Sequence, residues 1–218
     1  MPEVVLIRAG STEFDDQNRI QGRLDLPLSP RGEQEAQRLV HQLRDVSLEV
    51  LYTAPSDPAR ATALVIGARL DIPIKELPNL QNLDQGLWQG LCVDEIKRKH
   101  PKVYKQWRES PETVCPPEGE TVSEALTRIR KVLQKPLKRK DCFGVVASEP
   151  LATLIHCLIA GCLPEISTTL RDSTDKEPVE VLHVARGGLT PAAVAAAVPA
   201  ENIKTADTSQ PALRGGES

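Results

Sequence analysis

Four histidines and five cysteines are the side chains of this sequence that most readily act as nucleophiles, proton carriers or metal ligands. The number of cysteines is odd and no two are spaced as C-x-x-C, which argues against a disulfide framework and a zinc site. For each histidine a surface or core position in a helical or strand pattern is the simpler interpretation: His41, His100, His156 and His183. The sequence therefore predicts no metal site and no cofactor.

Polar turns follow two short apolar runs. Residues 4–7 are followed by a polar turn that begins at Arg8, and residues 143–147 are followed by Ser148. Runs of this length and composition are typical of buried strands. Ligands of parallel sheets usually lie beyond the carboxyl ends of the strands. We therefore expect the functional residues from Arg8 onward and from Ser148 onward.

The elements that would position these turns alternate along the chain. Further strands are predicted at residues 49–52, 72–77 and 179–184, and helices begin near residues 30, 58, 121 and 150. Ser29 precedes Pro30 as a helix cap, and Thr121 forms a capping box with Glu124. Strands that alternate with helices imply a mostly parallel sheet covered on both faces. The predicted fold class is a three-layer α/β/α sandwich.

The domain organisation follows from the same pattern. Residues 1–185 are predicted to form one α/β domain, with a helical insertion at about residues 78–120 over the ligand end of the sheet. Residues 186–218 change character, and we expect a short alanine-rich helix followed by a disordered tail.

Composition excludes several classes of partner. The net charge is −3 and the pI is near 5.9, so nothing suggests binding to nucleic acid or an anionic membrane. The interrupted basic run at residues 135–140 is interpreted as a solvated helix end. No signal peptide and no membrane span is found in the sequence, which predicts a cytoplasmic protein.

Several blocks of the sequence carry a family resemblance. They occur in the expected order at residues 6–12 (LIRAGST), 19–22 (RIQG), 25–29 (DLPLS), 60–61 (RA), 86–90 (GLWQG) and 117–121 (PEGET). The first resembles L-x-R-H-G-E-T, the fifth G-x-W-E-G and the last P-G-G-E-S, all signatures of the histidine phosphatase (phosphoglycerate mutase-like) superfamily. The resemblance covers roughly residues 3–184 and implies the phosphoglycerate mutase-like fold.

The resemblance also implies a mechanism, and three of its residues are replaced. In the family one histidine becomes phosphorylated, an acid protonates the leaving oxygen, and a second histidine and two arginines hold the phosphoryl oxygens. Here the corresponding positions are Ala9, Asn82 and Ser148. A methyl group cannot accept a phosphoryl group, and an amide cannot act as a general acid. Losing such a nucleophile typically costs about a million-fold in rate, so the sequence leans against enzymatic activity.

The resemblance leaves a set of residues for binding. Arg8, Arg19 and Arg60 match cationic positions of the family pocket, and Gln21 and Gly22 offer polar and backbone groups to an anion. Arginine pairs suit phosphate geometry well. These five residues are the predicted ligand-binding set.

Two acidic residues would modify this pocket. Asp15 stands where the family usually has asparagine, and Glu149 stands where it usually has glycine. One hypothesis is that the carboxylate of Glu149 enters the pocket and pairs with Arg8 or Arg60 in place of a phosphate. The other is that Glu149 caps its helix and points to solvent.

Three function classes remain open at this point. The leading prediction is a catalytically inactive homologue that binds a phosphorylated ligand or a protein partner without turnover. The first alternative is a phosphatase or phosphoglycerate mutase with weak or non-standard activity, and the second is a structural accessory domain. Neither nucleic acid nor membrane is expected as a partner, and a homodimer is an open alternative.

Overall fold

The structure is a computed structural model that describes residues 3–138, 141–162 and 177–184. The predicted alanine-rich helix and tail at residues 186–218 lie outside the described residues. None of the helices in the described ranges is long and apolar enough to cross a membrane.

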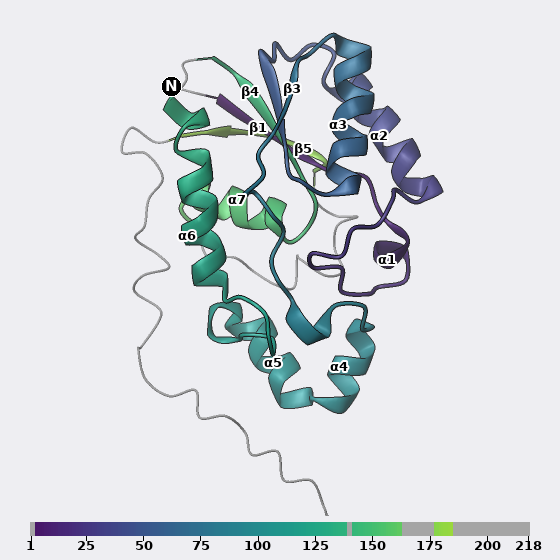
Figure 1. Cartoon of the computed structure of the whole chain (residues 1–218), viewed down its shortest axis with the longest axis vertical. Helices are drawn as coiled ribbons and strands as arrows, with labels where there is room; N and C mark the ends of the chain where they lie inside the picture. Colours follow the sequence, from purple (N-terminus) through teal and green to yellow (C-terminus); the bar gives the residue numbers. More distant parts are fainter. Residues whose placement is uncertain (1–2, 139–140, 163–176, 185–218) are drawn as a thin grey trace, which may run out of the picture.

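A five-stranded sheet forms the centre of the molecule (Figure 1). Its order is β3-β2-β4-β1-β5, and every pairing is parallel except that of β5 with β1. The strands are β1 (Glu3–Arg8), β2 (Val50–Thr53), β3 (Ile74–Glu76), β4 (Phe143–Ala147) and β5 (Val179–His183). Strand β4 is buried along its whole length, and β1 is buried except at its first residue. Both are therefore mainly apolar runs, which is typical of strands covered on both faces.

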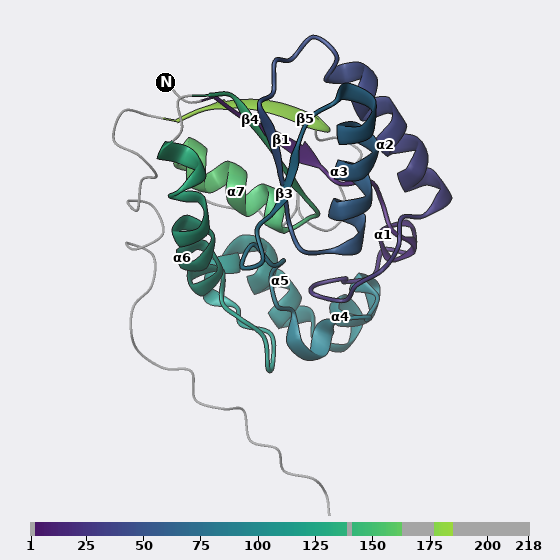
Figure 2. The ribbon, with the colours of Figure 1, turned by 45° about the horizontal axis from the view of Figure 1, so that its top comes forward.

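Helices cover both faces of the sheet. Figures 1 and 2 show α2 and α3 on one side and α6 and α7 on the other. Their bounds are α2 (Pro30–Gln42), α3 (Asp57–Leu70), α6 (Val122–Leu133) and α7 (Leu151–Ala160). This arrangement confirms the predicted three-layer α/β/α class with a mostly parallel sheet.

The sequence signals at the helix starts have the expected geometry. The side chain of Ser29 accepts a hydrogen bond from the backbone of Gly32, and Pro30 is the first residue of α2. Thr121 and Glu124 form a reciprocal capping box at the start of α6. Helix α7 begins at Leu151, one residue later than predicted, and β3 is shorter than the predicted strand. Strand β3 begins directly after Pro73, which has no backbone N–H to donate to a strand.

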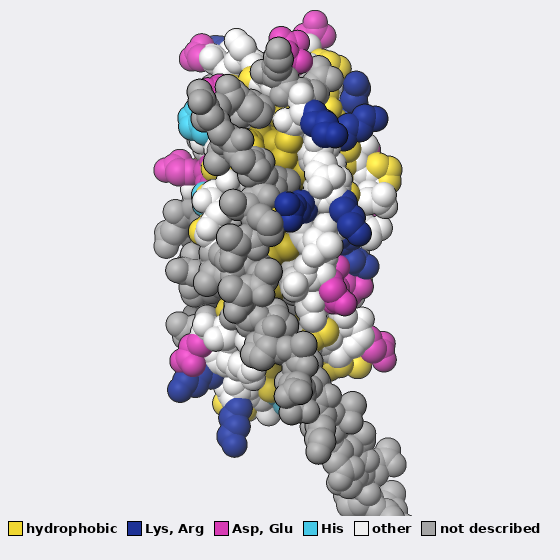
Figure 3. Space-filling view, turned by 90° about the vertical axis from the view of Figure 1, so that its left-hand side faces the viewer, with side chains coloured by type: hydrophobic (Ala, Val, Ile, Leu, Met, Phe, Trp, Pro, Cys, Tyr) yellow, Lys and Arg dark blue, Asp and Glu magenta, His cyan; other side chains and the backbone are white. Residues whose placement is uncertain are grey.

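Helix α6 is amphipathic. Its buried face includes Leu126, Ile129 and Leu133, while basic residues occupy its last turn. Lys and Arg side chains gather on one side of the surface that contains this helix (Figure 3). Such a solvated face is the ordinary outcome of packing an amphipathic helix on a sheet. Part of the predicted basic helix end after α6 is the 3₁₀ turn η3 (Pro136–Lys138).

Short helices lie beyond the carboxyl ends of the parallel strands (Figure 2). They are α1 (Glu13–Asp16), η1 (Gly86–Trp88), α4 (Val93–Lys99), α5 (Pro101–Glu109) and η2 (Pro111–Thr113). A second hydrophobic cluster holds the insertion together, centred on Trp88 and Trp107 with ring centroids 5.1 Å apart. These short helices therefore share a small core with Ile20, and they lie over the end of the sheet where β1 and β4 stop.

Candidate functional site

A cavity of about 660 Å³ lies at the carboxyl ends of β1 and β4. Its position follows from the pairing of these strands, in which Arg8 is opposite Ala147. The two turns that follow the strands therefore start side by side. Residues from both turns and from α1, α2 and α4 line the cavity. Those predicted from the sequence that line it are Arg8, Ala9, Asp15, Arg19, Gln21, Gly22, Ser148 and Glu149.

The guanidinium group of Arg8 is held by acidic partners. Arg8 is 8% exposed, and its Nε donates to Oε1 of Glu149 at 2.8 Å. Its Nη1 donates to Oε1 of Glu180 at 2.7 Å and to the carbonyl oxygen of Glu177 at 2.7 Å. Two carboxylates thus share one guanidinium, a charge balance that the sequence motifs alone do not reveal.

Glu149 combines parts of the two predicted arrangements. The predicted pairing with Arg8 is present, and its other carboxylate oxygen, Oε2, accepts hydrogen bonds from the hydroxyl and backbone N–H of Thr153 at 2.7 and 3.3 Å. The residue therefore caps the first turn of α7 while facing the cavity. Its side chain is only 11% exposed, so the alternative in which it points to solvent is wrong. A carboxylate is favoured at a helix N-terminus, which explains why both contacts coexist.

Ser148 lines the cavity next to Glu149, and its Oγ is buried without a hydrogen-bond partner in the described ranges. Gln85, at the start of η1, also lines the cavity, is 2% exposed, and has an Oε1 in the same unpartnered state. Buried polar atoms are normally hydrogen-bonded. These two oxygens therefore mark the part of the cavity wall whose polar groups are incompletely satisfied.

Arg19 is the second of the predicted arginines that lines the cavity. Arg19 donates from Nη1 to the carbonyl oxygen of Gly90 at 2.7 Å and from Nε to Oε1 of Gln17 at 2.9 Å. Gly22 adopts a positive φ of 58°, and a Cβ there would lie 2.4 Å from Oε1 of Gln89. Unlike Arg8, Arg19 forms no ion pair with a carboxylate among the described residues.

Asp15 belongs to α1 and faces the cavity. Its Oδ2 accepts from the backbone and the hydroxyl of Thr12, both at 2.7 Å. Although part of the residue is exposed, the surrounding walls desolvate the carboxyl group, and this raises the pKa of Asp15. The Thr12 hydrogen bonds oppose the shift, and the nearby charges of Asp16 and Glu35 add to it. A carboxylate whose pKa is raised holds a proton more tightly than an ordinary aspartate, which suits it to accept one.

Arg60 is not brought into the cavity. It lies on α3 and donates from Nε to Oε2 of Glu76 at 2.8 Å and from Nη1 to Oδ1 of Asp57 at 2.6 Å. It is absent from the described lining of the cavity. The prediction that Arg60 binds the ligand therefore has no support from this geometry, because acidic residues of its own helix and of β3 hold the side chain outside.

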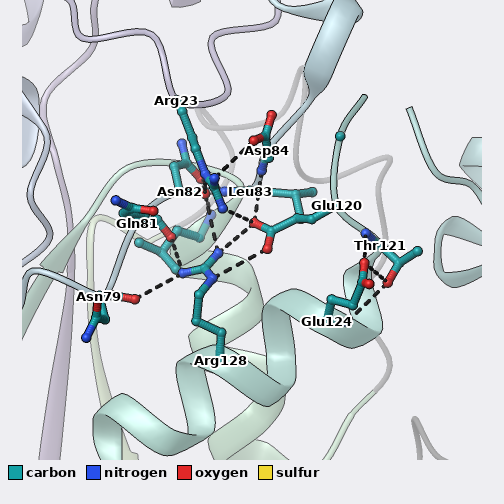
Figure 4. A network of polar contacts seen from close by, with 12 residues as sticks. Arg23, Asn79, Gln81, Asn82, Leu83, Asp84, Glu120, Thr121, Glu124 and Arg128 are labelled. Atoms are coloured by element: carbon teal, nitrogen blue, oxygen red, sulfur yellow. Dashed lines mark hydrogen bonds and ion pairs between the residues drawn. The ribbon is translucent and has the colours of Figure 1, made fainter. Parts of the chain in front are cut away.

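Asn82, at the predicted acid position, is buried and does not line the cavity. It belongs to a polar network around Arg128, whose guanidinium donates to carboxylate oxygens of Glu120 and to the carbonyl oxygens of Asn79, Gln81 and Asn82 (Figure 4). Asp84, an acidic residue two positions further along the chain, pairs with Arg23 at 3.0 Å in the same network. Neither residue is placed to protonate a leaving group in the cavity.

The sequence reasoning missed residues of α2. Arg31, Glu35 and Arg38 line the cavity from one face of this helix, at spacings of four and three residues. Glu35 accepts from the hydroxyl and backbone N–H of Ser11 at 2.7 and 2.9 Å and pairs with Arg31 at 2.8 Å. The spacing itself was a usable signal, since residues three and four apart share a helix face.

Comparisons with known proteins agree on one family. The family described as the histidine phosphatase superfamily (branch 1) matches residues 4–172. Phosphoserine phosphatase 1 of Hydrogenobacter thermophilus is 27% identical over 186 residues, which cover 84% of this chain and 87% of that protein. A Serratia proteamaculans protein named "Probable phosphoglycerate mutase GpmB" is 29% identical over 170 residues, 78% of this chain and 75% of its own.

Solved structures show the same fold. A mycobacterial glucosyl-3-phosphoglycerate phosphatase superposes with a TM-score of 0.70 at 23% identity, over 76% of this chain and 85% of its own. Bacillus stearothermophilus YhfR superposes with a TM-score of 0.73 at 23% identity, over 87% and 95% of the two chains.

These relatives contradict the leading prediction of a catalytically inactive homologue. Proteins that match most of the chain are named as phosphatases or as a phosphoglycerate mutase, so the enzymatic alternative has the better support. The physical reason for the error is specific. Replacing two histidines and one acid removes one route of phosphoryl transfer, but it leaves an arginine-lined cavity in the same place.

Proposed function

The chain belongs to the histidine phosphatase superfamily (branch 1), and from this premise we propose that it is a phosphatase that hydrolyses phosphate monoesters of small molecules. The observation that carries the proposal is the cavity at the end of β1 and β4, into which four arginines project: Arg8, Arg19, Arg31 and Arg38. Guanidinium groups stabilise the charge that spreads over phosphoryl oxygens in the transition state. The cavity volume lies in the usual range for small-molecule sites.

The attacking group in this proposal is water. The methyl group of Ala9 cannot hold a phosphoryl group, so the P–O bond of the ester is broken as a water oxygen bonds to phosphorus. Asp15 takes the proton of that water, since the raised pKa of its carboxyl group makes it a better base than an ordinary aspartate. The proton taken up by Asp15 then returns through solvent water to the leaving oxygen, so the products are an alcohol and inorganic phosphate.

Hydrolysis is favoured over the mutase reaction for a related reason. A mutase has to keep the phosphoryl group away from water and return it to the substrate. The family does this through a phosphorylated histidine, a role that Ala9 cannot fill. Direct attack by water requires no covalent intermediate. The rate is therefore expected to be low compared with enzymes that retain the nucleophile.

The substrate class is drawn from the relatives. Two of them are named for phosphoserine and glucosyl-3-phosphoglycerate, which are both phosphorylated small molecules. We therefore propose a phosphate monoester of this size. Several polar groups on the cavity wall, including Ser148 and Gln85, are available to contact the rest of such a molecule.

The test is release of inorganic phosphate from a panel of monoesters, namely phosphoserine, 3-phosphoglycerate and p-nitrophenyl phosphate. Arg19→Ala is expected to lower kcat/KM by about a hundredfold, the usual cost of removing one group that stabilises transition-state charge. Arg69→Ala is the matched control, because Arg69 is an exposed arginine at the end of α3 outside the cavity. Release that is absent from the wild type, or equal in wild type and Arg19→Ala, would overturn the proposal.

A further inference from the structure

The Glu149 carboxylate occupies a donor of Arg8 that an incoming phosphoryl group would need. Both side chains are nearly enclosed, at 9% and 11% exposed. Nε and Nη2 of an arginine point the same way and form a fork that binds two oxygens of a carboxylate or phosphate. Glu149 uses only one prong, because its Oε1 lies on Nε and its Oε2 lies on Thr153.

The second prong is open. No hydrogen bond from Nη2 of Arg8 is found within the described residues, whereas Nη1, on the other side of the guanidinium, is held by Glu180 and by the carbonyl oxygen of Glu177. Glu180 is itself fixed, since its Oε2 lies 2.6 Å from Nδ1 of His156. A phosphoryl group that accepts two hydrogen bonds from Arg8 therefore fits only the Nε–Nη2 side. The carboxylate of Glu149 occupies one of the two donors on that side.

Displacement of Glu149 from this side does not require the loop to unfold. Its carbonyl oxygen accepts from Nδ2 of Asn82 at 2.9 Å, which fixes the backbone. Its Oε2 stays on Thr153, at the positive end of the α7 dipole, where a carboxylate is favoured. The contact between Oε1 and Nε is the one that is exchanged for a phosphoryl oxygen.

We propose that Glu149 is an autoinhibitory residue that acts as an internal competitor for Arg8. In the ligand-free protein its carboxylate takes the place of one phosphoryl oxygen, and a substrate binds by displacing it. The inference rests on the proposed phosphatase function, since it assumes that the cavity receives a phosphoryl group. The competition weakens binding of phosphorylated ligands and raises KM, with a smaller effect on kcat.

The experiment measures binding of inorganic phosphate by calorimetry at constant pH, so it does not depend on turnover. Glu149→Gln is expected to lower the Kd by about ten- to a hundredfold, because a hydrogen bond to a charged group no longer competes with the ligand. Glu120→Gln is the matched control. Glu120 has a side chain that is 15% exposed and pairs with two arginines (Figure 4), but it does not line the cavity.

Two further variants make the result decisive. Thr153→Val keeps the charge of Glu149 but removes the hydroxyl that holds Oε2, so it should alter the Kd while Glu120→Gln does not; it also serves if Glu149→Gln fails to fold. Arg8→Ala combined with Glu149→Gln should abolish the gain in affinity. A Kd that is unchanged or higher in Glu149→Gln, an equal gain in Glu120→Gln, or a gain that survives Arg8→Ala would overturn the inference. Phosphate binding that responds as expected without any ester hydrolysis would instead overturn the proposed function alone.

Discussion

The amide nitrogen of Asn82 donates a hydrogen bond to the carbonyl oxygen of Glu149 at 2.9 Å. The amide oxygen of the same side chain accepts from the backbone N–H groups of Leu83 and Leu151 at 2.9 and 3.1 Å. One buried side chain therefore ties the strand-to-helix turn that carries Ser148 and Glu149 to the start of the insertion. A position at which the family resemblance implies an acid is occupied here by a structural link.

Asn82→Ala should destabilise the protein by about 2–4 kcal/mol, because it leaves buried backbone groups without partners. Urea unfolding monitored by circular dichroism would measure the loss. Asn79→Ala is the control, since the Asn79 side chain is exposed and should change stability by no more than about 0.5 kcal/mol. Equal effects of the two substitutions would contradict the role assigned to Asn82.

Asp15→Asn should stabilise the protein at neutral pH. The raised pKa of Asp15 means that the folded state binds its proton more tightly than the unfolded state does. The contribution of Asp15 to stability is therefore full below about pH 4 and is lost as the pH rises through the folded-state pKa. Asparagine cannot ionise, and its amide oxygen still accepts from Thr12. The difference in unfolding free energy between variant and wild type should grow from pH 4 to pH 7; a difference that is independent of pH would refute this account.

Gly32→Ala should destabilise the protein. A Cβ at Gly32 would lie 2.0 Å from the carbonyl oxygen of Ser11 and 2.7 Å from its nitrogen, so α2 or the turn after β1 has to shift. In an unhindered helix the same change stabilises by about 1 kcal/mol, whereas this contact should reverse the sign and cost about 1–3 kcal/mol. Thermal unfolding of this variant should be compared with that of Gln34→Ala, a substitution at an exposed position of the same helix. The comparison separates the effect of the clash from that of helix propensity. A rise in Tm for Gly32→Ala would count against the close approach.

Arg128→Lys should weaken the link between α6 and the insertion by about 1–3 kcal/mol. The guanidinium donates to the carboxylate of Glu120 and to the carbonyl oxygens of Asn79, Gln81 and Asn82 (Figure 4). A single ammonium group cannot reach all of these acceptors. Chemical unfolding should show the loss, while Arg130→Lys on the same helix should leave stability nearly unchanged. If Arg128→Lys is as stable as the wild type, the network contributes orientation only.

The sequence predicts the layers of this fold well because each layer has a local signature. The run at residues 143–147 is apolar throughout because β4 is buried on both faces. Ser29 and Thr121 mark helix starts through hydrogen bonds to residues only three positions further along the chain. Such contacts between residues close in sequence do not depend on the rest of the fold, and the structure contains them as predicted. The same holds for the placement of Arg8 and Ser148, which follow directly from the ends of two strands.

The charge distribution of the site was harder to predict, because it depends on distant contacts. Arg60 is turned away from the cavity by Glu76, a residue of β3, and Arg8 is neutralised in part by Glu180, a residue of β5. No spacing within a motif encodes either pairing. The function was also misjudged for a physical reason: the missing histidines describe one mechanism, whereas the arginines of α2 that complete the cavity lie outside the recognised blocks.

Among the described strands, β1 comes first along the chain and lies in the sheet between β4 and β5, which come last. Arg8 and Glu180 are separated by 172 positions along the chain. Such pairings have high contact order and form slowly, since a long loop must close before they are gained. During synthesis, one edge of β1 therefore stays unpaired until β4 has emerged, and the other until β5 has emerged. The cavity therefore cannot form from the N-terminal half of the chain alone, because its wall needs the turns after both β1 and β4.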